Sequence, residues 1–420
     1  MKKFLFLIVL ISPLLLHAQQ VLDLDTCYDL AEKNYPLAQQ SDLLKNKIDS
    51  EINTIKKEQY PKLDLNAQAT YQSDVIEFPL QLPNVTIEAP NKDQYRATLD
   101  ANQLIYNGGI IAATTQLKTA ELQSQQQQVV VNLYQLKSRI NQYYFGTLLF
   151  QKHLELLNTK KEQLALRLAE VNSGIKFGAV LASAGQIIEA ELLKIEQQIS
   201  QANFDRKKAL DNLSSLINMT FDDDIILSQP ISTLSFEAKS KRPELKLFEL
   251  KEQEIEASKE VNSKLKYPKV MGFAQVGYGN PGLNMLDNSF QDFYMAGIKL
   301  HWNIFDWGKT KEKDKVLTIS QQLINTERET FNLNNEIQLK ELENDRNKYL
   351  QLILTDSQII NLREKVLDAS NSQLRHGVIT ASQYIIDFNM LYEAKTDQQI
   401  HEIQLGLTTA NYLVVKGVSE

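Results

Sequence analysis

Long stretches of the chain repeat apolar residues at alternating steps of four and three positions. In the first half, one such series runs Val129, Leu133, Leu136, Ile140, Tyr143, Thr147, Phe150, Leu154, Leu157, Lys161, Leu164, Leu168 and Val171. Only Thr147 and Lys161 depart from its apolar character. A period of 3.5 residues aligns these side chains in one seam, which packs against neighbouring helices in a coiled coil. The same spacing returns from Ile188 to Leu216, so the pattern predicts two antiparallel helices joined by a tight turn.

The outgoing helix of this pair is predicted to run from about Gly109 to Asn172. At 1.5 Å per residue it would be about 95 Å long. No ordinary globular core needs a helix of that length, whereas a helical tube or a stalk does. The second half repeats the pattern less regularly, over residues 309–374 and then 382–415.

Four shorter segments alternate with a period of two, which is typical of strands. They span residues 62–72, 94–105, 269–279 and 293–304. Each has about ten alternating residues, the length that a tilted strand needs to cross a bilayer, and tyrosines near the ends suit the two interfaces. A soluble sheet with one buried face is the alternative. The helices already use their apolar stripes on each other, so membrane-spanning strands are favoured.

The same order of elements occurs twice in the sequence. Tyr60-Pro61-Lys62 matches Tyr267-Pro268-Lys269 at an offset of 207, and residues 105–109 match 304–308 at an offset of 199. Each copy reads helix, strand, loop, strand, long helix, tight turn and helix. The predicted organisation is therefore a signal peptide at 1–18, a first repeat at 19–221, a linker or equatorial segment at 222–242, and a second repeat at 243–420.

Four strands are too few to close a barrel. In hydrocarbon the two open edges would leave rows of backbone groups without hydrogen bonds, at several kcal/mol each. The chain must therefore assemble with copies of itself. Two copies give an eight-stranded barrel filled by side chains, whereas three copies give twelve strands with room for water. The polar residues expected on the inner face favour the wet lumen; they are Asp64, Asn66, Asp100, Asn102 and Lys299.

The N-terminus has the pattern of a secretory signal peptide. Lys2 and Lys3 precede an apolar stretch that is too short to span a membrane, and Leu16-His17-Ala18 is a suitable cleavage site. The formal net charge of the 420-residue chain is -7, which makes nucleic acid an unsuitable partner for an exported protein. The single cysteine, Cys27, is expected to be a thiol on the first helix, because it does not directly follow the apolar stretch as a lipidated cysteine would.

The residues give no sign of catalytic or cofactor chemistry. The five histidines do not have metal-ligand spacing, and no phosphate-binding glycine loop or nucleophile elbow is present. No metal, cofactor or catalytic residue is therefore predicted, and the chain is not expected to be an enzyme.

The duplicated plan resembles the TolC-like outer-membrane efflux proteins, the exit ducts of Gram-negative tripartite pumps and type I secretion systems. The two Tyr-Pro pairs, Ile304-Phe305-Asp306-Trp307-Gly308 and the stretches 374–380 and 391–395 support this resemblance. It implies a homotrimer with a twelve-stranded barrel in the outer membrane and an α-helical barrel in the periplasm. A periplasmic adaptor (a membrane fusion protein) would open it, and an inner-membrane pump of the RND or ABC type would supply the energy.

Two groups of residues acquire roles from this resemblance. The first marks the junction of barrel and tunnel and comprises Tyr60, Pro61, Gly108, Gly109, Tyr267, Pro268, Trp307 and Gly308. The second forms the hairpin tips that would dock the adaptor and comprises Gly174, Gly178, Ala179, Ser183, Gly377, Val378 and Ser382. Small residues at the tips would let another helical hairpin approach closely.

The gate departs from the pattern of the best-known family member. Acidic residues and an arginine follow the second tip there, whereas residues 379–387 here contain no arginine and one acid, Asp387. Asp387 is a possible gate residue, or an ordinary exposed carboxylate on a helix. The main alternative to a channel is a periplasmic coiled-coil adaptor or scaffold without a pore. The transported substrate, the identity of pump and adaptor, and the ion selectivity do not follow from the sequence.

Overall fold

The computed structural model describes residues 21–76, 89–178, 180–222, 225–230 and 240–418. The expected signal peptide, residues 1–18, lies outside these ranges. The chain divides into two compact units, each of which takes segments from both predicted repeats. The first comprises Met1–Ala38, Val131–Arg242 and Asn332–Glu420, and the second comprises Gln39–Val130 and Pro243–Phe331.

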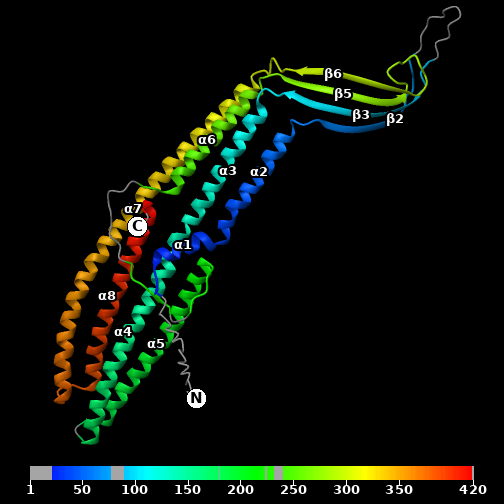
Figure 1. Cartoon of the computed structure of the whole chain (residues 1–420). Helices are drawn as coiled ribbons and strands as arrows, with labels where there is room; N and C mark the ends of the chain where they lie inside the picture. Colours follow the sequence, from blue (N-terminus) through cyan, green and yellow to red (C-terminus); the bar gives the residue numbers. More distant parts are fainter. Residues whose placement is uncertain (1–20, 77–88, 179, 223–224, 231–239, 419–420) are drawn as a thin grey trace, which may run out of the picture. The chain divides into compact units, whose positions relative to one another are not determined.

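The elements follow the predicted alternation of long helices and strand pairs (Figure 1). The first unit contains β1 (Val21–Leu22), α1 (Leu24–Asn34), α4 (Leu136–Lys176), α5 (Ala182–Ile217), β4 (Ile226–Leu227) and α8 (Ala381–Lys416). The second contains α2 (Gln40–Lys57), β2 (Lys62–Tyr71), β3 (Asp93–Tyr106), α6 (Pro243–Lys264), β5 (Lys269–Asn280) and β6 (Gln291–His301). Three helices have residues in both units, namely the short 3-10 helix η1 (Pro36–Gln39), α3 (Ile110–Tyr134) and α7 (Lys309–Arg375).

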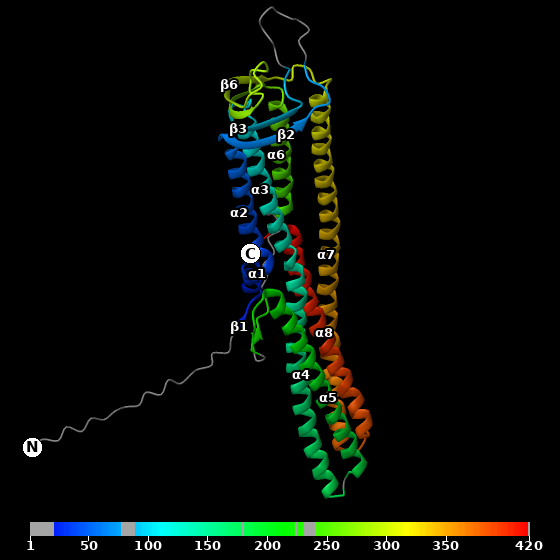
Figure 2. The same cartoon turned by 90° about the vertical axis from the view of Figure 1, so that its right-hand side faces the viewer.

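The two long outgoing helices differ in continuity. In the second half, α7 is one helix of 67 residues (Figure 2). In the first half, the single helix predicted over 109–172 is wrong in detail, because Gln135 separates α3 from α4. The interruption is slight: Gln135 keeps right-handed helical dihedrals, and its N–H donates to the Val131 carbonyl at 3.1 Å. Periodicity could not reveal it, since the buried face of the helix hardly changes.

The predicted seam packs as expected in the first unit. Leu157, Leu164 and Val171 of α4 are buried against Ile188 and Ile195 of α5. Aromatic residues of α8, among them Phe388, complete this cluster. The two departures from the apolar seam are accommodated differently. Thr147 is fully buried and its hydroxyl donates to the Tyr143 carbonyl, whereas Lys161 is half-buried and pairs with Glu196 at 2.8 Å.

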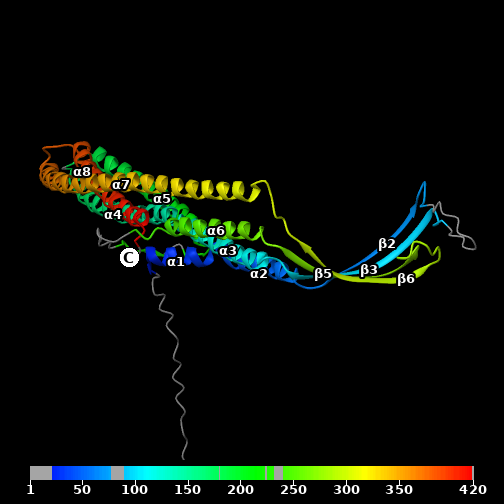
Figure 3. The same cartoon turned by 90° about the horizontal axis from the view of Figure 1, so that it is seen from above.

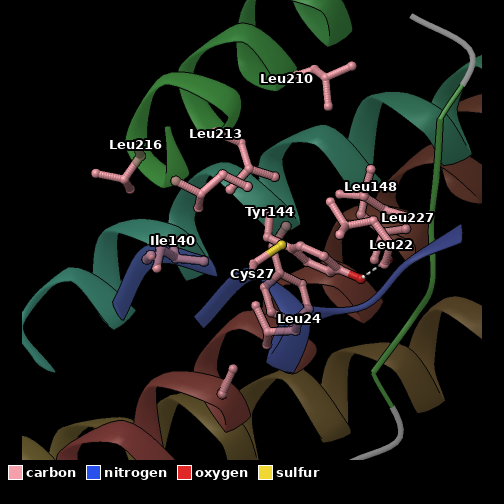
Figure 4. Close-up of a cluster of buried hydrophobic side chains, with 14 of the residues drawn as sticks. Leu22, Leu24, Cys27, Ile140, Tyr144, Leu148, Leu210, Leu213, Leu216 and Leu227 are labelled. Carbon is pink, nitrogen blue, oxygen red and sulfur yellow. Dashed lines mark hydrogen bonds between the residues drawn. The ribbon is translucent and has the colours of Figure 1, made fainter. Parts of the chain in front are cut away.

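A second cluster of the first unit surrounds a short parallel strand pair that the sequence did not predict. β1 pairs with β4, which lies inside the expected linker 222–242. The Tyr144 hydroxyl lies 3.0 Å from the Leu22 carbonyl and 2.6 Å from the Ser228 carbonyl, and thus ties both strands to α4 (Figure 4). Cys27 is fully buried beside it on α1, where desolvation, assisted by Asp23 and Asp25, raises the pKa of its thiol to about 12. The thiol therefore stays protonated.

The strands of the second unit form one antiparallel sheet in the order β2-β3-β5-β6 (Figure 3). The two hairpins, β2-β3 and β5-β6, meet where β3 pairs with β5. β2 and β6 are the edge strands, each with one neighbour among the described residues. The strand bounds lie within three residues of the expected ones; the largest differences are at β6, which ends at His301 rather than at residue 304.

Among the described residues, no helix combines the length and the apolar character needed to span a membrane.

The hydroxyl of Tyr144 provides a test of the first unit. We predict that Tyr144→Phe lowers the free energy of unfolding by about 1 to 3 kcal/mol, because buried carbonyls lose their donor. Denaturant unfolding followed by circular dichroism measures the change. Tyr143→Phe is the matched control, since the adjacent Tyr143 is partly buried and its hydroxyl makes no hydrogen bond to the residues that the structure describes. Equal effects of both substitutions on the free energy of unfolding would contradict a stabilising role for the hydrogen bonds of the Tyr144 hydroxyl.

Candidate functional site

The sheet has two chemically different faces. Directly paired residues share a face, and one row across the four strands consists of Leu65, Leu99, Val276 and Tyr294. The neighbouring row on the same face is Leu63, Ala101, Ala274 and Ala296. Both rows follow from alternation in each strand combined with the register of the ladders. The result is a continuous apolar face.

This apolar face is exposed to an unusual degree. Leu65 is 78% exposed, Tyr294 81% and Ile298 73%. Large exposed apolar patches mark surfaces that contact a membrane or another protein. Tyrosines gather toward the loop end of the face, at Tyr71, Tyr95 and Tyr278.

The opposite face carries the polar residues expected to face a lumen. Asp64 and Asp100 are directly paired, and Asp100 accepts hydrogen bonds from Asn66 at 2.7 Å and from Thr98 at 3.1 Å. A shallow hollow of about 380 Å³ lies on this face. Its lining includes the whole predicted inner set, which is Asp64, Asn66, Asp100, Asn102 and Lys299. The predicted set thus does come together.

Two aromatic rings on the polar face lie over glycines. Phe293 is paired with Gly277, and Phe273 with Gly297. A Cβ added to Gly277 would lie 2.3 Å from the Phe293 ring, and one added to Gly297 would lie 2.9 Å from the Phe273 ring. The rings therefore occupy the space that side chains at these glycines would fill. This arrangement explains how the second hairpin keeps large apolar residues on a face that is otherwise polar.

The expected junction residues lie where helices and strands meet. Tyr60-Pro61 separates α2 from β2, and Tyr267-Pro268 separates α6 from β5. Proline cannot continue a helix and disfavours the helical conformation of the preceding residue, so neither helix can extend through its Tyr-Pro pair. The helices end three residues earlier, at Lys57 and Lys264. Tyr60 is 66% exposed and Tyr267 is 49% exposed.

The turn between β3 and α3 has the same hydrogen bond as the turn between β6 and α7. Asn107 accepts from the Gly109 N–H at 3.1 Å, and Asp306 accepts from the Gly308 N–H at 3.0 Å. The Thr310 hydroxyl and backbone also donate to Asp306, which lowers the pKa of its carboxyl.

The middle residues of these turns have left-handed backbone conformations. Gly108 has φ +69°, and its counterpart Trp307 has φ +54° although it carries a side chain. A Cβ at Gly108 would lie 2.5 Å from Tyr267 Cβ, so glycine is required there. Trp307 is 88% exposed. The two turns are therefore alike in backbone but differ in what surrounds them.

The expected tip residues lie in the two tight turns of the first unit. Gly178 follows α4 and Gly377 follows α7; both have φ +71°, and both have open space around them. Ser183, Val378 and Ser382 are exposed. Gly174 lies one turn back, where a Cβ would meet Val180 at 2.8 Å. Ala179 lies outside the described residues.

The expected gate residue, Asp387, is half-buried on α8. It accepts a hydrogen bond from the Ser370 hydroxyl of α7 at 2.5 Å and one from the Gln383 amide at 3.3 Å. The carboxylate thus links α7 to α8.

Sequence reasoning missed a set of polar contacts between the two helical hairpins. Arg167 of α4 donates to Asn371 of α7, and Arg375 of α7 pairs with Glu170 of α4 at 3.2 Å. The Arg167 guanidinium also lies 5.3 Å from the ring centre of Tyr384. These arginines precede the tips in the sequence, whereas the pattern of the best-known family member has its arginine after the second tip.

A buried ion pair joins α4 to α5. Lys160 and Glu191 approach to 3.8 Å, and Asn389 of α8 donates to Glu191 at 3.0 Å. Burial lowers the pKa of Lys160. The seam pattern pointed to Lys161 as the irregular position, but Lys160 is the buried lysine.

Within the ranges that the structure describes, no group of three or more His, Cys, Asp or Glu residues could hold a metal ion.

Comparison with solved structures finds similar folds among outer-membrane proteins. The chain is similar to the outer membrane protein VceC of Vibrio cholerae, with a TM-score of 0.65 at 14% identity over 94% of this chain and 96% of that one. It is also similar to the MtrE outer membrane channel of Neisseria gonorrhoeae in its open state, with a TM-score of 0.64 at 16% identity over 94% and 89% of the two chains.

The CmeC outer membrane channel of Campylobacter jejuni gives the same result, with a TM-score of 0.63 at 13% identity over 94% of this chain and 85% of that one. Searches of family models and of curated proteins find no match. At these identities the likeness shows the fold. The resemblance drawn from the duplicated sequence plan is therefore confirmed at the level of fold.

Proposed function

We propose that this chain is an outer-membrane channel of a Gram-negative bacterium, the exit duct of a tripartite efflux pump or a type I secretion system. The observation that supports this most is the sheet of the second unit. It has an exposed apolar face, a polar opposite face and two edge strands. Lipid can cover the first face, water can fill the space beside the second, and copies of the chain can pair the edges.

The proposed assembly is a homotrimer. Three copies would contribute twelve strands to one transmembrane barrel, which leaves an aqueous lumen, whereas eight strands from two copies would be filled by side chains. The long helices would form the α-helical barrel in the periplasm. Their length fits this role, because α7 alone spans about 100 Å at 1.5 Å per residue.

The helical tips are the proposed docking site for a periplasmic adaptor. Besides the small residues already named, the tips carry exposed apolar side chains, since Phe177 is 86% exposed, Leu181 79% and Val378 70%. Such side chains at the end of a hairpin offer a partner helix an apolar contact. The adaptor would open the duct, and an inner-membrane pump of the RND or ABC type would supply the energy.

The contacts between the hairpins provide the proposed gate. Opening the tips would separate α4 from α7, and this would break the bonds of Arg167 and Arg375 described above. Asp387 would act indirectly, by holding α8 against α7 through Ser370. In this proposal the protein is a passive conduit and catalyses no reaction.

The alternative of a periplasmic adaptor or scaffold without a pore receives less support. A scaffold has no need for a sheet with one strongly exposed apolar face, and the fold is shared with outer-membrane channels over most of both chains.

The membrane assignment of the sheet can be tested with two adjacent residues of β2. Ala67 lies on the apolar face and Asn66 on the polar face, both near the middle of the strand. We predict that Ala67→Arg lowers outer-membrane insertion, because an arginine that faces lipid near the midplane costs about 2 to 4 kcal/mol. Asn66→Arg, the matched control, should insert normally. Heat-modifiable migration and pore formation in planar bilayers measure the two outcomes.

Purified wild-type protein should form stable ionic pores in the same bilayers. Absence of conductance from correctly assembled protein would favour the scaffold. Normal insertion of the Ala67→Arg variant would contradict the assignment of Ala67 to a lipid-facing position.

Docking at the tips can be tested at Gly377. We predict that Gly377→Trp abolishes the export phenotype that deletion of the gene reveals, without preventing trimer formation. Gly377→Asn is the control, because asparagine tolerates the left-handed backbone conformation found there. Gly178→Trp should abolish export as Gly377→Trp does, and Gly178→Asn should leave export intact as Gly377→Asn does. Full export by both tryptophan variants would contradict docking at the tips.

A further inference from the structure

The polar face of the sheet has two unlike halves. Every residue that β2 and β3 place on this face is polar, from Lys62 to Thr70 and from Gln94 to Asn102. The part of the same face that β5 and β6 contribute includes four large apolar residues, which are Met271, Phe273, Phe293 and Met295. The first hairpin therefore forms a polar half of this face, and the second hairpin forms an apolar half.

The apolar half is not a consequence of how the hairpins pair. Both hairpins have the same register, since Lys62 pairs with Asn102 and the equivalent Lys269 pairs with His301. Each apolar residue of the second hairpin therefore has a counterpart in the first. These counterparts are all polar, namely Asp64, Asn66, Gln94 and Arg96. The pairing of the strands thus tolerates polar side chains at all four positions.

Packing against the sheet explains the two phenylalanines. The rings of Phe273 and Phe293 lie over glycines, as described above. The Arg96 guanidinium also lies 5.5 Å from the ring centre of Phe293, which is buried. These contacts give both rings a place in the sheet of a single chain.

Packing within the chain does not explain the two methionines. Met271 is paired with Lys299 and Met295 with Gln275, so neither is paired with a glycine. Met271 is 37% exposed and Met295 is 44% exposed. Two exposed methionines therefore occupy a face that is otherwise suited to water.

The methionines line a hollow together with an aromatic residue. Met271, Phe273 and Met295 form the apolar part of the wall of the 380 Å³ hollow on this face. Thioether side chains are flexible and polarisable, and they make favourable contacts with aromatic rings. Aromatic side chains also pack against other rings edge-on or offset. The wall is therefore suited to a flat apolar group that enters from the solvent.

The charges around this wall balance. The hollow is also lined by Asp64, Asp100 and Lys299. An adjoining hollow toward the helices shares Met271 and is lined by Glu58, Lys62 and Lys269. Among the described residues, the two hollows thus hold three carboxylates and three ammonium groups. Such a mixture creates little net potential, so the surroundings of Met271 do not select the sign of a solute's charge.

We propose that the hollow lined by Met271, Phe273 and Met295 binds the aromatic ring, or another flat apolar group, of a solute in the lumen, whatever the sign of the solute's charge. This inference rests on the proposed channel, because the polar face becomes the inner wall only in an assembled barrel. Each copy of the chain would contribute one such site. The polar half beside it would bind the polar groups of the same solute.

Block of the pore current by small soluble probes tests the site. N-acetyltryptophanamide carries an indole ring and no net charge, and N-acetylalaninamide lacks the ring. We expect the indole compound to lower the conductance of wild-type pores in planar bilayers at concentrations at which the alanine compound has no effect. Tryptamine, a cation, and indole-3-acetate, an anion, should block with similar affinity, because the charges around the hollow balance.

The double variant Met271→Gln with Met295→Gln tests which residues bind the ring. Glutamine keeps the length of the side chain and removes the thioether. We expect block by N-acetyltryptophanamide to weaken by about 2- to 12-fold for each thioether–aromatic contact that is lost. Met285→Gln is the matched control, because Met285 is an exposed methionine between β5 and β6 that does not line the hollow. Its block should equal that of the wild type.

Three results would overturn the inference while leaving the proposed channel intact. They are equal block of conducting wild-type pores by the two amides, unchanged block in the double methionine variant, and a strong preference for either tryptamine or indole-3-acetate. Failure of the proposed function would look different, because the wild-type protein would then form no conducting pores in the absence of any probe.

Discussion

The proposed assembly depends on the hydrogen-bonding requirement of the backbone at the edges of one four-stranded sheet. In that sheet, β3 and β5 each pair with two strands of the same chain. The edge strands β2 and β6 have one neighbour each among the described residues. An unpaired edge is a site for another strand in water and is intolerable in lipid. The exposed apolar face imposes a second requirement, since only lipid or protein can cover it. Together these requirements are the reason why we propose a membrane assembly of several copies.

The internal repeat places equivalent features at corresponding positions of the two halves of the chain. The same tyrosine-proline entry, the same hairpin register and the same strand-to-helix turn occur in both halves. Trp307 in place of the glycine at position 108 is the clearest departure, and it lies at the edge that we assign to contact between copies. The two repeats therefore differ where their environments would differ in an oligomer.

Much of the fold could be predicted from the sequence. A period of 3.5 residues located the seam of α4 and α5, because burial selects one face of each helix. A period of two located all four strands of the sheet, because its two faces carry different types of residue. The break at Gln135 and the β1-β4 pair were not predicted, since neither changes the pattern of apolar residues. The contacts of Arg167, Arg375 and Lys160 were missed for a related reason. They join residues about 30 to 220 positions apart, and no local pattern indicates which distant side chain a charged residue meets.

The central claim is that several copies of the chain pool their strands. Native mass spectrometry of protein extracted from outer membranes with mild detergent measures the number of copies directly. The account predicts a complex with the mass of three processed chains that dissociates only under denaturing conditions. A protein recovered without detergent as a single chain would contradict it, because the apolar face and both edges of the sheet would then be stable in water.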